Sequence, residues 1–218
     1  MTGFPRSPKL LKGGIVLVDP DTAAVLRVIG LQYNPDSLTR TLQVQGVGEN
    51  ADRSEVLRLK GPPIETFKLE AELDLTDQLE FPSDNALAVQ VGLHAQLAAL
   101  ETIIYPPSDR LIANHSLAQG GTLEIAPMES SLTLFVWSKV RIVPVRLTEF
   151  SITEEAFDTS LNPIRAKVSL GMRVLSVVDL GFAHHGGALY MAYQQQKERL
   201  AAQATSGSLN LLGIGGLL

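Results

Sequence analysis

Residues 64–75 read Ile-Glu-Thr-Phe-Lys-Leu-Glu-Ala-Glu-Leu-Asp-Leu, and this stretch decides the fold class. Apolar and polar side chains alternate strictly along it, which is typical of a β-strand with one packed face and one wet face. The packed face carries Phe67, Leu69, Ala71, Leu73 and Leu75, whereas the wet face carries Lys68, Glu70, Glu72 and Asp74. The chain is therefore expected to build a sheet that buries one side.

Further strand patterns lie on both sides of this segment. They cover residues 14–18, 25–33, 38–45, 123–126, 132–138 and 140–152, and the last two are rich in Val, Ile and aromatic residues. Pro144 interrupts the last of them. Because proline donates no ladder hydrogen bond, its part of the strand is expected at a sheet edge or a bulge.

A hairpin is predicted near the end of the strand-rich region. Residues 149–153 face residues 166–170 across the link EEAFDTSLNP, residues 154–163. This link is too long for a two-residue turn. We therefore expect a long hairpin with a projecting tip.

One helix is predicted between the strands. Ser83, Asp84 and Asn85 offer N-cap oxygens. Val89, Leu93, Leu97, Leu100 and Ile104 then recur three or four residues apart, which indicates a single buried stripe. A weaker helical pattern covers residues 183–204, and a Gly-rich apolar tail, which either frays or docks on a neighbouring subunit, completes the chain.

These patterns predict a mainly β (α+β) protein with about eight or nine antiparallel strands, closed as a barrel or rolled into a sandwich. The helix would plug or flank one side. Residues 1–180 would form this β domain, and residues 181–218 a helical extension with its tail.

Composition excludes several classes of function. The net charge of −5 argues against a nucleic-acid surface, which needs a basic face. The absence of cysteine excludes disulfides, thiolate metal sites and a cysteine nucleophile. No run approaches the roughly 18 apolar residues of a membrane helix, and no signal peptide is expected.

No catalytic residue, metal or cofactor is predicted, because neither a G-x-S-x-G motif nor a phosphate loop is present. His184 and His185 are adjacent without a third ligand, which favours a helix start or a loop over a metal site. Glu70, Glu72 and Asp74 most simply form a solvated face. An acid/base pair is the less favoured alternative, and an interface or a lumen lining stays open.

The Asn34-Pro35-Asp36-Ser37 corner breaks a strand pattern. Asn34 and Asp36 can accept hydrogen bonds from nearby backbone N–H groups, Pro35 fixes φ, and Ser37 can add another local bond. These residues predict a rigid local turn that lets the chain re-enter another strand pairing.

Three segments resemble the tube-domain family of contractile injection systems, which are phage-tail-like particles of bacteria. They are LQYNPDSLTR at residues 31–40, LRLKGPPIETFKLEAELDLTDQLE at residues 57–80, and EEAFDTSLNPIRAKVSLGMRVL at residues 154–175. The resemblance covers roughly residues 11–180 and follows the family's order. It implies a tail-tube-like β-barrel in a ring of six copies, assembled in the bacterial cytoplasm. A LysM module found in longer relatives does not follow, so no carbohydrate binding is carried over.

The resemblance and the residue patterns together predict a non-enzymatic baseplate or tube-initiator component. It would form a ring that connects the spike hub to the inner tube, with other baseplate proteins as neighbours. The residues expected at its interfaces are the arm Glu154, Glu155, Phe157, Asp158, Leu161, Asn162 and Pro163, with Asn34, Pro35, Asp36 and Ser37 as a structural corner. The alternative is a β-barrel that binds a small ligand.

Overall fold

The computed structural model describes residues 11–46, 57–119, 130–204 and 213. Seven strands form one antiparallel sheet in the order β2-β1-β5-β6-β7-β4-β3. In chain order the strands are β1 (Gly14–Val18), β2 (Val25–Gly30), β3 (Thr39–Gln43), β4 (Ile64–Asp74), β5 (Leu132–Ser138), β6 (Arg141–Phe157) and β7 (Pro163–Val174). The strand expected at residues 123–126 and nearly all of the tail lie outside the described residues.

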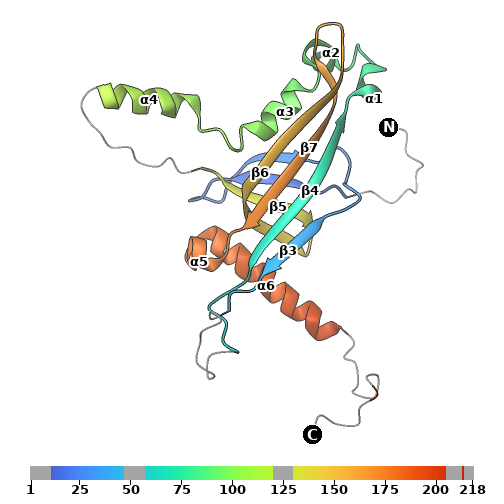
Figure 1. Ribbon diagram of the computed structural model, residues 1–218. Coiled ribbons are helices and arrows are strands. Elements are labelled where there is room, and N and C mark those ends of the chain that lie inside the picture. Colours follow the sequence, from blue (N-terminus) through green and yellow to red (C-terminus); the bar gives the residue numbers. More distant parts are fainter. Residues whose placement is uncertain (1–10, 47–56, 120–129, 205–212, 214–218) are drawn as a thin grey trace.

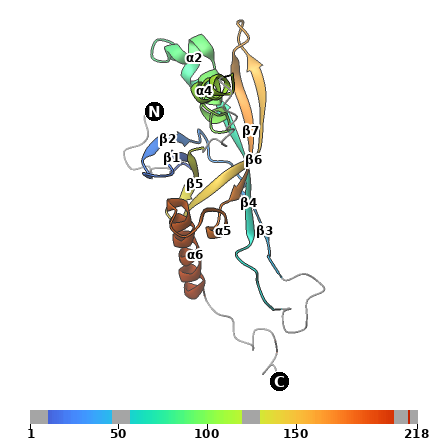
Figure 2. The same ribbon diagram turned by 90° about the vertical axis from the view of Figure 1, so that its left-hand side faces the viewer.

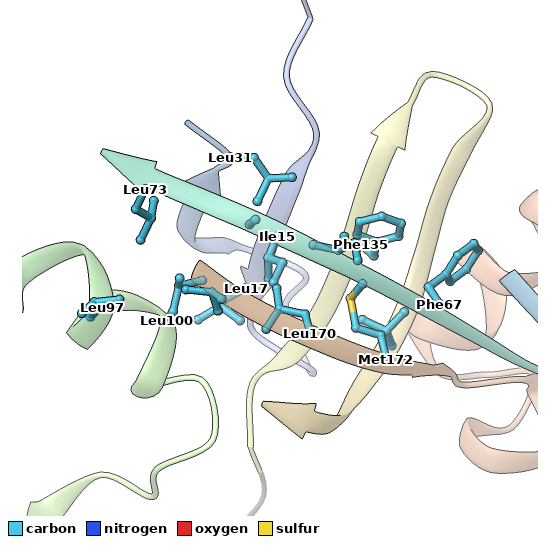
Figure 3. Packing of buried hydrophobic residues seen from close by; sticks show 14 of the residues in the cluster. Ile15, Leu17, Leu31, Phe67, Leu73, Leu97, Leu100, Phe135, Leu170 and Met172 are labelled. Carbon is cyan, nitrogen blue, oxygen red and sulfur yellow. The ribbon is translucent and has the colours of Figure 1, made fainter. Parts of the chain in front are cut away.

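The fold is α+β, but the sheet is not closed into the expected barrel. Strands β2 and β3 form its two ends, and each pairs with a single neighbour in the described chain. The sheet nevertheless rolls up, because Phe67 of β4 lies against Phe135 of β5 with ring centroids 5.3 Å apart although two strands separate them. Figure 3 shows both rings in one core.

The long strand β6 produces this roll. Its first residues, up to Val145, pair with β5, and the rest, from Val145 onward, pairs with β7. Pro144 sits at the changeover, inside the sheet and away from the register shifts of β6, so the expectation of a sheet edge or a bulge is wrong. Its carbonyl accepts from the Leu175 N–H at 2.9 Å, just past the last β7 pair at Val174, so the missing N–H removes no ladder bond.

Six helices occur in the described chain, where one core helix and a C-terminal helix were expected. They are α1 (Thr76–Leu79), α2 (Ala86–Val91), α3 (His94–Glu101), α4 (Ser108–Gln119), α5 (Val177–Leu180) and α6 (His185–Gln203). The predicted single helix breaks at Gly92, whose φ is +54°, into α2 and α3. Helix α4 extends away from the sheet and buries none of its residues (Figure 1).

The C-terminal helix α6 confirms the weaker of the two helical patterns. It buries Tyr190 and Tyr193 in the same core as the sheet residues. Figure 2 shows α6 beside the lower part of the sheet, opposite the end at which the β6–β7 hairpin projects. The division of the chain at residue 180 stays a prediction.

Side chains fill the interior of the roll. Phe67 and Met172 are fully buried and Phe135 is 1% exposed, and aliphatic residues from β1, β4, β7 and α3 surround them (Figure 3). A barrel that binds a small ligand needs a hollow in this position. The packed centre therefore weighs against the alternative function.

Candidate assembly surfaces

The outer edge of β2 presents backbone groups that have no partner in the part of the chain that the structure describes. In an antiparallel ladder, the N–H and C=O of successive residues point alternately to the two sides of the strand. The Leu31 N–H donates to the Gly13 carbonyl at 2.9 Å, so residue 31, and residue 29 before it, face β1. Val28 and Gly30 therefore direct their backbone groups away from the sheet.

The outer edge of β3 is open in the same way. Thr39, Thr41 and Gln43 pair with alternate residues of β4, so Arg40 and Leu42 point their backbone groups outward. Both edges also expose apolar side chains: Val28 is 67% exposed and Leu42 is 45% exposed. Strand β2 also carries Arg27, and β3 carries Arg40 among polar residues. The unpaired backbone groups of such an edge are nevertheless a template for pairing with another chain.

The strands with the clearest sequence patterns do not supply these edges. Residues 64–75 and 140–152 carry the clearest strand patterns, but β4 and β6 lie inside the sheet with a neighbour on each side. Within the described ranges, the strands left with a free long edge are the two short ones, β2 and β3.

The β6–β7 hairpin is more regular than predicted. Glu154 and Glu155 pair with Ala166 and Arg165, so the ladder runs through most of the expected loop. Phe157 and Pro163 form the last pair, which leaves residues 158–162 as the turn. Figure 2 shows the hairpin projecting beyond the sheet beside α2.

Asp158 organises this turn. Its carboxylate accepts from the Ser160 N–H at 2.7 Å, from the Asn162 N–H at 2.8 Å and from the Asn162 side-chain amide at 2.8 Å. The bonds from the Asn162 side chain and backbone hold the pKa of Asp158 below its usual value. Leu161 adopts a left-handed φ of +63° and is 77% exposed, so an apolar side chain stands at the apex.

The base of the turn is anchored to the helices. The Pro163 carbonyl accepts from the Leu93 N–H at 2.9 Å, and a Cβ at Gly92 would lie 2.6 Å from that carbonyl oxygen. Pro163 itself is buried. Phe157 and Leu161 are thus the apolar arm residues that remain accessible, and the contact role of the arm stays a prediction.

Within the corner at residues 34–37, the Asn34 side chain makes long-range bonds where local ones were expected. The Asn34 side chain accepts from the Gly13 N–H at 2.9 Å and donates to the Leu11 carbonyl at 2.8 Å. The side-chain amide thus accepts and donates as a backbone peptide group of a neighbouring strand would, beside the chain that leads into β1. A sequence pattern cannot show this, because an Asn that bonds locally and one that bonds across 21 residues look alike.

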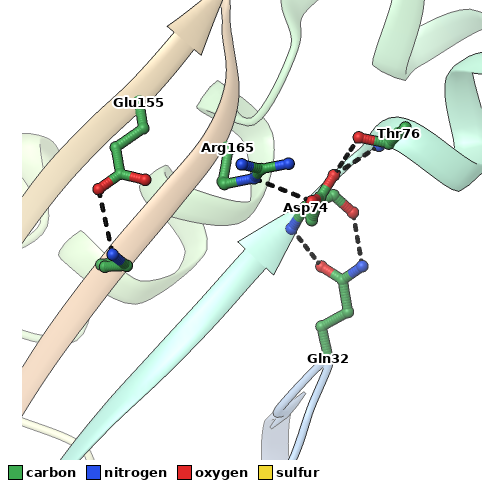
Figure 4. Close-up of polar contacts among 6 residues, drawn as sticks. Gln32, Asp74, Thr76, Glu155 and Arg165 are labelled. Atoms are coloured by element: carbon green, nitrogen blue, oxygen red, sulfur yellow. Dashed lines mark hydrogen bonds and ion pairs between the residues drawn. The ribbon is translucent and has the colours of Figure 1, made fainter.

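Gln32 joins the two ends of the rolled sheet. Its side chain accepts from the Asp74 N–H at 2.9 Å and donates to the Asp74 carbonyl at 2.6 Å (Figure 4). The segment after β2 therefore meets the end of β4 through a side-chain amide, where a closed barrel would have a strand ladder. Gln32 was not among the residues expected at a functional or structural site.

Ion pairs cross the wet face of the sheet. Asp74 binds Arg165 at 3.0 Å, and Glu155 binds Lys167 at 3.3 Å (Figure 4). The Thr76 hydroxyl, aided by the Thr76 N–H and Arg165, lowers the pKa of Asp74 despite partial burial. A carboxyl held ionised in this way is a poor general acid, so the geometry favours the solvated face over an acid/base pair.

Glu65 is a buried carboxylate that the sequence analysis missed. It is 2% exposed and accepts from the Tyr193 hydroxyl at 2.7 Å and from Lys197 at 2.9 Å, with Arg40 at 3.8 Å. Burial, with a contribution from Glu65, raises the pKa of Tyr193 to about 12. The sequence contained a signal for its burial: Glu65 lies two residues before Phe67 and therefore points to the same, packed face of β4. The network ties α6 to the sheet.

His184 caps α6, which confirms the helix-start interpretation of the histidine pair. Its Nδ1 accepts from the Gly186 N–H at 3.0 Å. Within the described ranges, no group of three or more His, Asp or Glu side chains is placed to hold a metal ion. None of the helices described there is long and apolar enough to span a membrane.

Comparisons with known proteins add little to this picture. No family model matches the chain, and no curated protein matches it. One solved structure is similar to 75% of this chain and 90% of its own, with 12% identity and a TM-score of 0.29; it is described as the tail of an empty GTA particle with C6 symmetry. At that TM-score the likeness identifies neither a family nor a function.

Proposed function

We propose that this protein is a structural, ring-forming component of the baseplate of a contractile injection particle. In this role several copies, six by the family resemblance, join the spike hub to the inner tube. The observation that carries the proposal is the pair of strand edges, β2 and β3, that have no partner among the described residues and lie at opposite ends of one rolled sheet.

The two edges suit head-to-tail assembly. A copy that offers β3 to the β2 of its neighbour uses a different surface on each side, so the contact repeats and closes into a ring if the rotation allows. Each junction would join the outward backbone groups of Arg40 and Leu42 to those of Val28 and Gly30. The sheet would then continue from copy to copy around the ring.

The β6–β7 hairpin supplies a second contact in this proposal. It projects from the sheet with Phe157 and Leu161 exposed, and its turn is rigid because Asp158 and the α2–α3 junction hold it (Figure 2). A preorganised arm loses less conformational entropy when it binds a neighbour. We assign it to the next subunit, the inner tube or the hub. Assembly in the bacterial cytoplasm is part of the same proposal.

The substitution Val28→Pro tests the edge contact. The Val28 N–H points away from β1, so proline removes a donor for the neighbouring copy and leaves the β1–β2 ladder intact. The matched control is Val28→Thr, which keeps that N–H on a side chain of similar shape. We expect Val28→Pro to give a folded monomer by circular dichroism and light scattering, whereas the wild type and Val28→Thr form rings. Rings of Val28→Pro would contradict the edge contact.

Imaging of particles from a strain that lacks the gene tests the place in the particle. Without the ring that starts the tube, full-length particles should be absent. Normal particles in that strain would contradict the baseplate role even if the isolated protein forms rings.

A further inference from the structure

A third, shorter edge without a partner among the described residues lies inside the subunit, on β4. The Asp74 backbone faces Gln32 and the Leu75 N–H faces β7, so backbone groups of even-numbered residues on β4 point away from β7. The backbone groups of Thr66 and Lys68 pair with β3, which begins at Thr39 opposite Lys68. The backbone groups of Glu70 and Glu72 point the same way and have no partner among the described residues.

Pro35 explains why β3 stops short of this edge. The register that pairs Thr39 with Lys68 would, if continued, put Ser37 opposite Glu70 and Pro35 opposite Glu72. Proline has no N–H to donate at that position, so the ladder cannot extend through it. Residues 33–38 therefore lie outside the ladder with β4, and the next hydrogen bonds of this segment to β4 are those of Gln32 to Asp74.

The detour leaves a cleft of about 510 Å³ between the corner and β4. It is lined by Tyr33, Asn34, Pro35, Asp36, Ser37, Glu70 and Glu72. Its three carboxylates, from Asp36, Glu70 and Glu72, have no ion-pair partner among the described residues. The cleft thus combines a strand edge with a negative rim and fits a short, extended, basic segment.

We infer that the occupant is the chain's own N-terminal segment, residues 1–10. The chain enters the described structure at the cleft wall, because Asn34 holds the Leu11 carbonyl and the Gly13 N–H. The segment reads MTGFPRSPKL and carries Arg6 and Lys9 without an acidic residue. From Leu11 back to Arg6, five residues can span up to roughly 17 Å, enough to reach along the cleft.

In this arrangement Arg6 and Lys9 pair with the carboxylates of Glu70 and Glu72, and the segment adds its backbone to the free edge. The segment shields an edge that would otherwise invite pairing with other chains. This inference concerns the single subunit and does not depend on the proposed ring.

A spin label tests the inference, because the chain has no cysteine and a single Ser7→Cys substitution gives one labelled position. We expect the nitroxide to broaden the amide NMR signals of Glu70 and Glu72 several-fold in the full chain. The same label at Ser208→Cys, in the other terminal segment, should leave them sharp. The charge reversals Arg6→Glu and Lys9→Glu, made together with Ser7→Cys, should restore most of the signal.

Two outcomes would overturn the inference. One is broadening that is absent or unaffected by the charge reversals. The other appears when labelled chains are mixed with isotope-enriched chains that carry no label: broadening there would assign the cleft to the segment of a neighbouring copy.

Discussion

Gln32 is the side chain that spans the gap in the rolled sheet, and its loss should be measurable. In Gln32→Ala the partly buried backbone groups of Asp74 lose both partners. We expect the free energy of unfolding to fall by about 1–3 kcal/mol, the usual effect of leaving buried polar groups unpaired. Urea titration measures this, with the exposed Gln43→Ala of β3 as control. An equal effect of both substitutions would mean that Gln32 does not hold the sheet ends together.

Deprotonation of Tyr193 should lower the stability of the folded protein at alkaline pH. Its folded pKa of about 12 exceeds the usual value of 10, so the stability it contributes is complete below pH 10 and is lost as the pH rises towards 12. Tyr193→Phe should lower the free energy of unfolding by about 1–3 kcal/mol at neutral pH, because Glu65 loses a hydrogen bond. The deficit relative to the wild type should shrink by about pH 11. A deficit that does not change with pH would exclude this linkage.

Residue-level prediction succeeded where one residue's chemistry decides the outcome. His184 as a helix cap follows from a side-chain acceptor placed before a helical pattern. Asn34 and Gln32 could not be assigned in the same way, because their partners lie 21 and 42 residues away and are set by the roll of the sheet. Glu65 could have been found from the alternation in β4 alone.

At the scale of elements, the arm gives the next prediction. Phe157→Asp combined with Leu161→Asp should leave the subunit folded, because both side chains are at least half exposed and Asp tolerates a left-handed φ better than Leu. The variant should fail to enter rings or particles, since charge replaces the apolar contact. Phe182→Asp, at another exposed apolar position, serves as the control. Normal incorporation of the double variant would remove the arm from the interface.

Strand boundaries at the arm show what a linear pattern misses. The link at residues 154–163 looks irregular because Glu154 and Glu155 break the apolar run, yet both belong to a ladder with β7. Neither face of that part of the hairpin needs to be apolar, since it projects beyond the core (Figure 2). The break at Gly92 was equally hidden, because its φ of +54° and the close approach of Asn162 and Pro163 require glycine there, and neither shows in the linear pattern.

At the scale of the whole molecule, two variants that each block one edge test whether β2 of one copy pairs with β3 of the next. Val28→Pro blocks the β2 edge, and Leu42→Pro blocks the β3 edge, because both N–H groups point outward. Each variant alone should stay monomeric. Their mixture should stop at a heterodimer of about twice the chain mass, since one good edge remains on each partner. Light scattering of the mixture measures this, and larger species would show that the edges are not the junction.

Closure of the sheet was the part of the fold that the sequence could not decide. Alternating patterns identified most of the strands, but an open roll and a barrel contain the same strands. The difference lies in Pro35, which prevents β3 from following β4, and in the amide of Gln32, which takes the place of a ladder. Each effect depends on which strands meet in space.

The count of strands has a directional consequence for any ring. Every pairing in the sheet is antiparallel and seven strands alternate, so the first and the last, β2 and β3, run the same way. Copies related by rotation about one axis share an orientation, and their junction would therefore be parallel. Its slanted bonds are weaker per residue than those within the subunit, so such a ring would come apart at its seams before its subunits unfold.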